Sequence, residues 1–293
     1  MRSLVIGLVW YASSASTALA ACDFDRASLS FSGSAIEQAR CLLRPVGVAG
    51  KISASSAPLP TPFEQLVGTS AATDRVKLAA LIARLGISAD ELGGSLASPL
   101  SHTTGQAPRS ATYFVIHDTS YNVCVDKGEF ARADDPAAPW NQASRYRGSG
   151  EAHLYITRDG KLIAPQGRTF STPWRATKFE DHLGPAVRGL FLHIESVQLR
   201  KADVPSGASA LNPSGDCRND RLSVEPGFST GQLERLALAY IAASARSGRW
   251  LIPAYHATID EGLSDGHDDP QRFDLSLWGQ HICRQLAALD TPC

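Results

Sequence analysis

The strongest constraint on the fold is a series of short β-type runs followed by one long helical pattern. Residues that favour strands dominate three stretches: ATYFVIHDT at 111–119, AHLYITRDGKLIAP at 152–165 and GLFLHIESV at 189–197. The RDG between two apolar runs of the second stretch predicts a hairpin turn. At 229–247 apolar residues recur at helical spacing, after a serine that can cap a helix. Strands with intervening helices predict an α/β fold, with a mixed central β-sheet flanked by helices.

The chain ahead of these runs has a different pattern. Residues 1–20, MRSLVIGLVWYASSASTALA, place one arginine before an apolar stretch that fades into small residues, which predicts a signal peptide. Because its apolar part is too short to cross roughly 30 Å of hydrocarbon, we expect no transmembrane span in the mature chain. Helical patterns at 34–43 and 72–86 predict a partly helical N-terminal extension at 21–107. The main domain then occupies 108–293.

The six cysteines favour export, because an even number in an exported chain is typical of disulfides. The sequence does not choose among the fifteen possible pairings. Cys22 with Cys41, and Cys283 with Cys293, are only the nearest neighbours along the chain. Residues 19–22 also resemble a bacterial lipobox, but lipid anchoring at Cys22 would leave at least one cysteine unpaired. We therefore favour soluble export, into the periplasm or the medium.

The charge balance bears on the class of partner. With 28 basic and 29 acidic residues the net charge is near zero, so electrostatics gives no reason to expect nucleic acid or an anionic membrane surface. The 293 residues, 43% of them hydrophobic, can build a sizeable core in one large or two modest domains. We expect a small or neutral partner, and a monomer.

The stretch PAYHATIDEGLSDGHDDPQRFD at 253–274 combines two histidines and several aspartates with turn residues. It is either a solvated acidic loop or half of a metal site that needs a distant ligand on a rigid element. His117 ends an apolar run, so we expect it at the end of a buried strand, where its side chain has limited freedom. Taken alone, such a histidine is most often satisfied by a core hydrogen bond. Its value lies in combination with the later stretch.

The combination is ordered: a histidine at the end of the first strand, an AHxxIxRDG hairpin, an apolar strand ending in glutamate, a long helix, then His followed by Asp-Pro-x-x-Phe-Asp. This order resembles the zinc-dependent N-acetylmuramoyl-L-alanine amidases, the family related to peptidoglycan recognition proteins and phage amidase lysozymes. The resemblance covers about residues 108–282. No single motif in it is specific, whereas the ordered set is. It implies a fold like that of the peptidoglycan recognition proteins and amidases.

The resemblance implies a set of zinc ligands: His117, His256 and Asp269. Two histidines and one carboxylate suit catalytic zinc, which keeps one position open. His267 stands where the family usually has a lysine, so the resemblance implies that it assists the oxyanion. It could instead replace Asp269 as a ligand. We prefer Asp269, because Phe273-Asp274 after the proline fits the family's spacing.

Glu195 matches the glutamate of the family's middle strand, which implies a role as general acid/base. On a strand it shares a face with His193. Its alternative is a charge paired with an arginine. We expect His153 to be structural, and we interpret the remaining aspartates of the 253–274 stretch as turn formers and solvated charges: Asp260, Asp265 and Asp268.

Two further features bear on specificity. Trp174-Arg175 stands where relatives often have Trp-His, which would alter substrate contacts rather than zinc. The span 199–227 is long and rich in Gly, Pro and Ser, so it is either a specificity loop or a surface elaboration pinned by Cys217.

Together these features predict an exported zinc hydrolase that cleaves the amide bond between N-acetylmuramic acid and L-alanine in bacterial peptidoglycan. The main alternative is a module of the same fold that binds peptidoglycan or muropeptide without cutting it. A metal-free hydrolase using Ser120 or Cys124 is a weaker rival, because neither lies in a GxSxG-type elbow or beside an evident base.

Overall fold

The computed structural model describes residues 22–56, 58–105, 107–124, 130–205, 207–218 and 221–293. The expected signal peptide, residues 1–20, lies outside the described residues. No helix in the described part of the chain has the length and apolar character needed to cross a membrane.

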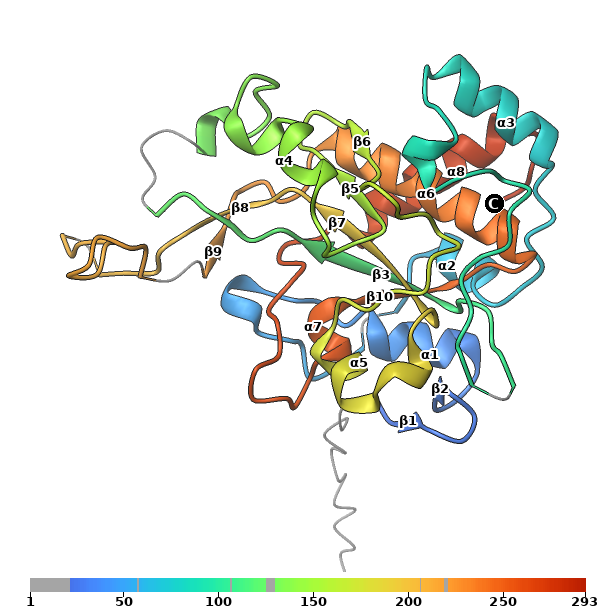
Figure 1. Cartoon of the computed structure of the whole chain (residues 1–293), viewed down its shortest axis with the longest axis horizontal. Helices are drawn as coiled ribbons and strands as arrows, with labels where there is room; N and C mark the ends of the chain where they lie inside the picture. The colour runs from blue at the N-terminus through green and yellow to red at the C-terminus, as the bar shows by residue number, and fades with distance from the viewer. Residues whose placement is uncertain (1–21, 57, 106, 125–129, 206, 219–220) are drawn as a thin grey trace, which may run out of the picture.

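A mixed five-stranded sheet forms the centre of the molecule (Figure 1). Its spatial order is β10 (Ile252–Tyr255), β3 (Tyr113–Asp118), β7 (Phe191–Ser196), β5 (Leu154–Ile156) and β6 (Leu162–Ile163). The first four strands run parallel, and β6 pairs antiparallel with β5. β3 and β7 are buried along their whole length, as strands covered on both faces must be. The predicted α/β class with a mixed central sheet is confirmed.

The helices pack around this sheet and start where the sequence offers caps. The long helix α6 (Thr230–Ser247) is capped by Ser229, with Gln232 completing a capping box. It packs beside α8 (Leu275–Ala287) (Figure 1). Six other α-helices are shorter: α1 (Ala35–Leu42), α2 (Thr61–Leu66), α3 (Arg75–Arg84), α4 (Ser144–Arg147), α5 (Lys178–Leu183) and α7 (His256–Ile259). Single 3-10 turns lie at Val48–Gly50, Asp90–Leu92, Phe130–Arg132, Pro139–Asn141 and Pro185–Val187.

The part of the chain before the sheet shares the same core. Helix α1 begins with a capping box of Ser34 and Glu37, and it packs against β10. A short hairpin precedes it, formed by β1 (Phe24–Asp25) and β2 (Ser30–Phe31). The hydroxyl of Tyr113 accepts a hydrogen bond from the Phe31 amide and donates one to Gln38, both from buried positions. Apolar residues of this segment and of the sheet belong to one continuous cluster.

The span 199–227 is more ordered than an ordinary loop. It contains β8 (Leu199–Lys201) and β9 (Leu222–Ser223), which form a three-stranded sheet with β4 (Tyr121–Asn122). The arm that carries β8 and β9 projects from the body (Figure 1). These two strands were not predicted, because β8 finds its parallel partner far away in β4, a pairing that local pattern cannot show.

All six cysteines are paired, and three disulfides join Cys22 to Cys41, Cys124 to Cys217 and Cys283 to Cys293. The two nearest-neighbour pairings are therefore present, and the third pins the arm beside β4. Disulfides favour a non-cytoplasmic, oxidising compartment. Because the sulfur of Cys22 is bonded to Cys41, it offers no thiol for lipidation.

Candidate metal centre

Two parallel neighbouring strands bring the predicted ligands together. His117 lies at the end of β3, and His256 follows directly after β10, whose Tyr255 pairs with Ile116 of β3. Asp269 arrives from the segment between α7 and α8, and its carbonyl accepts the amide of Ala257 at 2.7 Å. One ligand atom from each of the three residues lies within 4.8 Å of the others.

The three ligand atoms fit a zinc ion. Nδ1 of His117 lies 2.9 Å from Nδ1 of His256, which lies 3.3 Å from Oδ2 of Asp269. The remaining edge, from Nδ1 of His117 to Oδ2 of Asp269, is 3.9 Å. Bonds to zinc near 2.0–2.1 Å in a tetrahedral arrangement would separate such atoms by about 3.3 Å, and the three observed edges bracket that value. All three side chains are buried, and imidazole and carboxylate are zinc ligands in chemical terms.

A buried ion pair fixes the position of Asp269. The backbone amide of Asp118 donates to Oδ2 of Asp269 at 2.9 Å. The carboxylate of Asp118 accepts two bonds from Arg200, at 2.7 and 2.9 Å, and one from the amide of Gln271 at 3.2 Å. Arg200 and Asp118 thus hold the end of β3 and the segment around Asp269 in one arrangement.

Asp260 lies behind His256, so its interpretation as a solvated turn former is wrong. Its carboxylate is buried, and Oδ2 lies 3.0 Å from Nε2 of His256. It also accepts the amides of Lys178 and Phe179 at the start of α5, at 3.3 and 2.9 Å. A carboxylate behind a metal-ligating histidine orients the ring and makes it a better ligand. The local pattern of turn residues concealed this because the burial comes from α5, far away in the sequence.

Glu195 stands next to the three ligands, directly opposite His117 in the register of β3 and β7. Its Oε1 lies 3.9 Å from Nδ1 of His117. Its Oε2 is buried and has no hydrogen-bond partner among the described residues. Burial, with the nearby charge of Asp269, raises the pKa of Glu195 well above the usual range of a glutamate. No arginine pairs with it among the described contacts, in contrast to the alternative considered from the sequence.

The charges of the metal-free centre are coupled. Burial alone would lower the pKa of His256, but the carboxylates of Asp269 and Asp260 outweigh it and raise that pKa to about 10. Burial would raise the pKa of Asp269, but the charge and hydrogen bond of His256 lower it. Burial and the neighbouring His256 hold the pKa of His117 well below its ordinary value. His117 thus presents a neutral ring, the form that binds a metal.

His267 lies at the rim of the centre, with about half of its side chain exposed. Its ring stacks on that of His256, with centroids 4.3 Å apart. Its Nδ1 lies 3.1 Å from the same Asp260 oxygen that faces His256. His267 groups with His256 and Asp260 in a second cluster, and this cluster does not include His117. Asp269 is the residue that joins His117 and His256.

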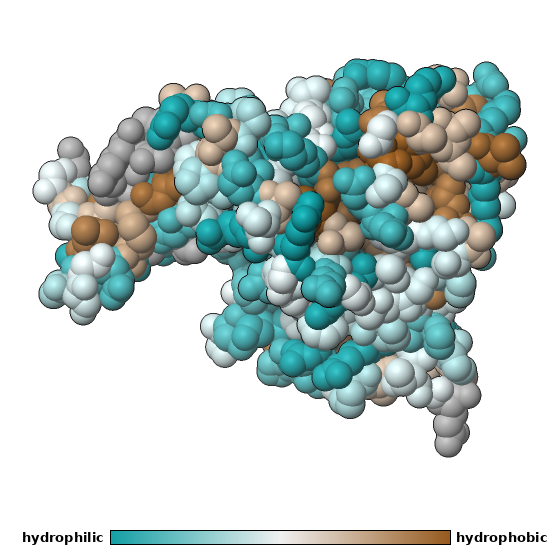
Figure 2. All heavy atoms as spheres, turned by 45° about the horizontal axis from the view of Figure 1, so that its top comes forward, coloured by the Kyte–Doolittle hydropathy of each residue, from teal (hydrophilic) through white to brown (hydrophobic). Residues whose placement is uncertain are grey.

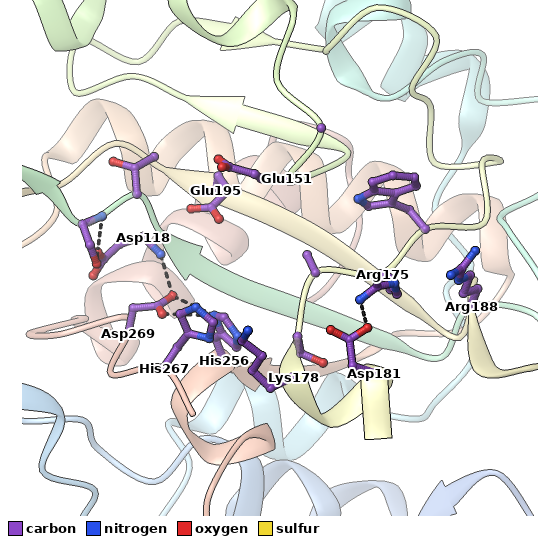
Figure 3. Close-up of a pocket in the computed structure, with 16 residues that line it drawn as sticks. Asp118, Glu151, Arg175, Lys178, Asp181, Arg188, Glu195, His256, His267 and Asp269 are labelled. Atoms are coloured by element: carbon purple, nitrogen blue, oxygen red, sulfur yellow. Dashed lines mark hydrogen bonds and ion pairs between the residues drawn. The ribbon is translucent and has the colours of Figure 1, made fainter. Parts of the chain in front are cut away.

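The centre opens into a cavity of about 590 Å³ (Figure 3). Glu195, His256, His267 and Asp269 line one part of it. At the other end lie Arg175, Asp181 and Arg188, with Arg175 and Asp181 forming an ion pair, and Trp174 is also part of the lining. The Trp174-Arg175 pair noted in the sequence therefore lies on the cavity wall. One end of the cavity carries the histidines and carboxylates of the centre, and the other carries the guanidinium groups of Arg175 and Arg188.

Two histidines near the centre stay off the cavity wall. His153 is fully buried: its Nδ1 accepts the His193 amide at 3.0 Å, and its Nε2 lies 2.9 Å from the Thr172 carbonyl. Because both of its ring nitrogens have hydrogen-bond partners, His153 has the structural role that the sequence predicts. His193 is also fully buried, and its Nδ1 lies 3.1 Å from Nε2 of His117. The sequence predicts only that His193 shares a face of its strand with Glu195.

Neither candidate nucleophile of a metal-free hydrolase, Ser120 or Cys124, is placed for that role in the fold. Cys124 is bonded to Cys217 and offers no thiol. The Ser120 hydroxyl lies 3.1 Å from Asp118, whose carboxylate is already engaged by Arg200. Neither residue has a histidine as hydrogen-bond partner among the described contacts.

The most apolar depression lies elsewhere on the molecule. Figure 2 shows a broad apolar area on the face that carries α3. A groove of about 540 Å³ there is lined by side chains such as Val76, Ile82 and Leu92. Its lining also includes Arg75 and Ser95 but no histidine or carboxylate among the described residues, so the polar cavity beside His256 is the candidate active site.

Comparisons with known proteins yield only distant likenesses. No protein-family model and no curated protein matches the sequence. Among solved structures, the hydrolase AmiA from Staphylococcus aureus, in complex with its ligand, is similar over 80% of this chain and 99% of its own, with 12% identity and a TM-score of 0.30. PGRP-Hd from Alvinella pompejana is similar over 67% of this chain and 91% of its own, with 12% identity and a TM-score of 0.25. At these scores the likeness carries no weight for function, which has to stand on the geometry of the site.

Proposed function

We propose that the protein is an exported zinc-dependent N-acetylmuramoyl-L-alanine amidase, which hydrolyses the amide between N-acetylmuramic acid and L-alanine in peptidoglycan. The observation that carries this proposal is the convergence of His117, His256 and Asp269 beside the unpartnered Glu195, where His256, Asp269 and Glu195 line an open polar cavity. Peptidoglycan lies outside the cytoplasmic membrane, which agrees with a chain held by three disulfides.

His117, His256 and Asp269 would hold the zinc ion. When bound, zinc lowers the pKa of a coordinated water toward about 7 and polarises the carbonyl to be attacked. The protein's own part is to keep the ligands fixed: Asp260 stands behind His256, and the Asp118 amide holds Asp269. The resulting site has its reactive groups in place before substrate arrives.

Glu195 would carry the proton. An amine anion is a poor leaving group, so the departing nitrogen needs a proton delivered to it. Glu195 can take that proton from the attacking water and pass it on, because its Oε2 has no competing partner among the described residues. Its raised pKa allows the carboxyl to hold the proton between these two transfers.

His267 would stabilise the negative charge that develops on the carbonyl oxygen. Its Nδ1 is engaged with Asp260, which leaves Nε2 toward the substrate. A hydrogen on Nε2 would donate to that oxygen, as the family's lysine would. Among the cavity residues, Trp174, Arg175 and Arg188 are placed to contact more distant parts of the substrate.

The test is digestion of purified peptidoglycan with the purified protein. We expect new L-alanine amino termini and intact glycan strands by mass spectrometry of the products, together with about one zinc per chain by metal analysis. A chelator should abolish release, and added zinc should restore it. Binding to peptidoglycan without any release would instead support a muropeptide-binding module, and cleavage that survives complete metal removal would exclude the zinc mechanism.

A further inference from the structure

A line of buried polar groups runs away from the metal centre on the side opposite the cavity. It begins at Nε2 of His117, which lies 3.1 Å from Nδ1 of His193. Nε2 of His193 lies in turn 3.1 Å from Oε2 of Glu180, on α5. The three residues are at most 1% exposed. None of them lines the cavity, so the line cannot touch a substrate directly.

The positions of the ring hydrogens along this line follow from its far end, where Nε2 of His193 has no hydrogen-bond partner among the described residues and lies 3.1 Å from Oε2 of Glu180. Oε2 of Glu180 accepts the amides of Ala176 and Thr177 at 3.2 Å and the Thr177 hydroxyl at 3.0 Å. An oxygen that already accepts three hydrogen bonds has no hydrogen to direct at Nε2 of His193, so the hydrogen between these two atoms belongs to that nitrogen. Nδ1 of His193 is then an acceptor, and it takes the Nε2 hydrogen of His117. The Nδ1 of His117 is left with its lone pair directed at the metal centre.

The ring of His193, in the middle of the line, is held by its neighbours, which opposes a reversal of the order of donors and acceptors. His193 stacks on His153, with centroids 5.6 Å apart and ring planes 12° from parallel. His153 also accepts the backbone amide of His193. Burying three polar side chains where apolar ones would pack has a cost unless they form hydrogen bonds. Core packing alone would not require a histidine and a carboxylate in line with His117.

We propose that His193 and Glu180 are positioning residues that fix the tautomer and orientation of His117, so that Nδ1 is its metal-binding atom. This inference rests on the proposed function, because it assumes that His117 binds zinc. Partners of this kind typically contribute about 10–100-fold to metal affinity. Glu180 lies on α5, which also forms part of the cavity wall. The same helix therefore supports the wall and, through His193, the candidate ligand His117.

Three substitutions separate this role from packing. His193→Phe keeps a flat buried ring but removes the acceptor for His117. His193→Asn places an amide oxygen where Nδ1 stood, and so restores that acceptor. Glu180→Gln keeps an oxygen for the Thr177 amide but presents an NH₂ group to His193, which allows the whole order of donors to reverse. His281→Asn, at a buried histidine outside the centre, is the matched control.

The experiment measures zinc affinity of the full-length mature protein by competition with a chromogenic chelator. We expect His193→Phe and Glu180→Gln to lose about 10–100-fold, while His193→Asn and the control stay within about threefold of the wild type. Nitrogen-15 shifts of the imidazoles in the metal-free protein give a second readout: His117 should carry its hydrogen on Nε2 in the wild type and on Nδ1 in Glu180→Gln. Thermal unfolding of each metal-free variant checks that it is folded.

The outcomes distinguish the two proposals. If the wild type binds zinc and both His193→Phe and Glu180→Gln bind it equally well, the positioning role is wrong and the amidase proposal stands. If the wild type binds no zinc at all, both are wrong. Should His193→Phe fail to fold, the contrast between His193→Asn and Glu180→Gln still decides: equal affinities in these two variants would overturn the inference.

Discussion

His117 and Glu195 face each other as direct partners across β3 and β7, and 3.9 Å separates Nδ1 of one from Oε1 of the other. The expected ligand and the expected proton carrier are therefore fixed by the register of two fully buried strands. A shift of either strand by one residue would turn its own side chain to the opposite face of the sheet. This rigidity allows the two roles to be tested separately by substitution.

Glu195→Gln should keep zinc and lose turnover. The amide has nearly the same shape but cannot carry the proton, so we expect kcat to fall by about 10²–10⁴-fold. Release of L-alanine amino termini from peptidoglycan gives the rate, and metal analysis gives the zinc content. A variant that hydrolyses at the wild-type rate would remove Glu195 from the mechanism.

His117→Ala should lose zinc and activity together, because only two protein ligands remain at a site that needs three. Metal analysis after dialysis and the same release assay measure both. His102→Ala, at an exposed histidine away from the centre, is the control and should behave as the wild type. Full zinc content in His117→Ala would mean that the ion is held elsewhere.

Arg200→Met should destabilise the fold strongly. It leaves Asp118 as a buried charge without its partner, which typically costs about 3–5 kcal/mol. Adding Asp118→Asn in the same chain should recover most of the loss, because the stranded charge is gone. Urea unfolding of the single and double variants measures this. Arg40→Met breaks an exposed pair with Glu64 and should cost less than about 1 kcal/mol. Equal losses in Arg200→Met and Arg40→Met would contradict the interpretation.

Acid should weaken the metal-free fold through His153. Burial, with the neighbouring His193, lowers the pKa of His153 from 6.5 to about 3. Between these values the unfolded chain binds a proton that the folded chain does not. The contribution of the neutral, buried His153 to the free energy of unfolding is therefore complete above pH 6.5 and is lost as the pH falls toward 3. From pH 7 to pH 4.5 this amounts to about 2–3 kcal/mol.

The check on His153 is unfolding by urea at both pH values, with a chelator present, in the wild type and in His153→Asn. The variant should be less stable at pH 7 but should lose less on acidification, by roughly the same 2–3 kcal/mol. Identical losses in the two proteins would show that the acid sensitivity has another source.

The sequence predicts those parts of the molecule that local pattern determines. The caps at Ser34 and Ser229 follow from short-range hydrogen bonds, and the hairpin between β5 and β6 follows from its turn. Gly160 in that turn has a φ of +80°. The proximity of His117, His256 and Asp269 could be predicted only from the ordered set of motifs that resembles a known family.

What the sequence could not show depends on contacts between distant segments. Asp260 looks like a solvated turn residue until α5 folds over it and donates two backbone amides. His193 acquires its contact with His117 only through the pairing of β3 and β7, and with Glu180 only when α5 packs beside it. Both residues have ordinary local surroundings in the sequence, and both lie directly behind a candidate ligand.

The segment ahead of residue 108 touches the candidate centre from behind. The Thr258 hydroxyl, two residues after His256, donates to the carbonyl of Leu42 at 2.6 Å, and α1 packs against β10, the outermost strand of the sheet. Outermost strands that lose their neighbours are prone to join other molecules edge to edge. We therefore expect a shortened chain that starts at residue 108 to self-associate, and the turn that carries the candidate ligand His256 to lose an anchor.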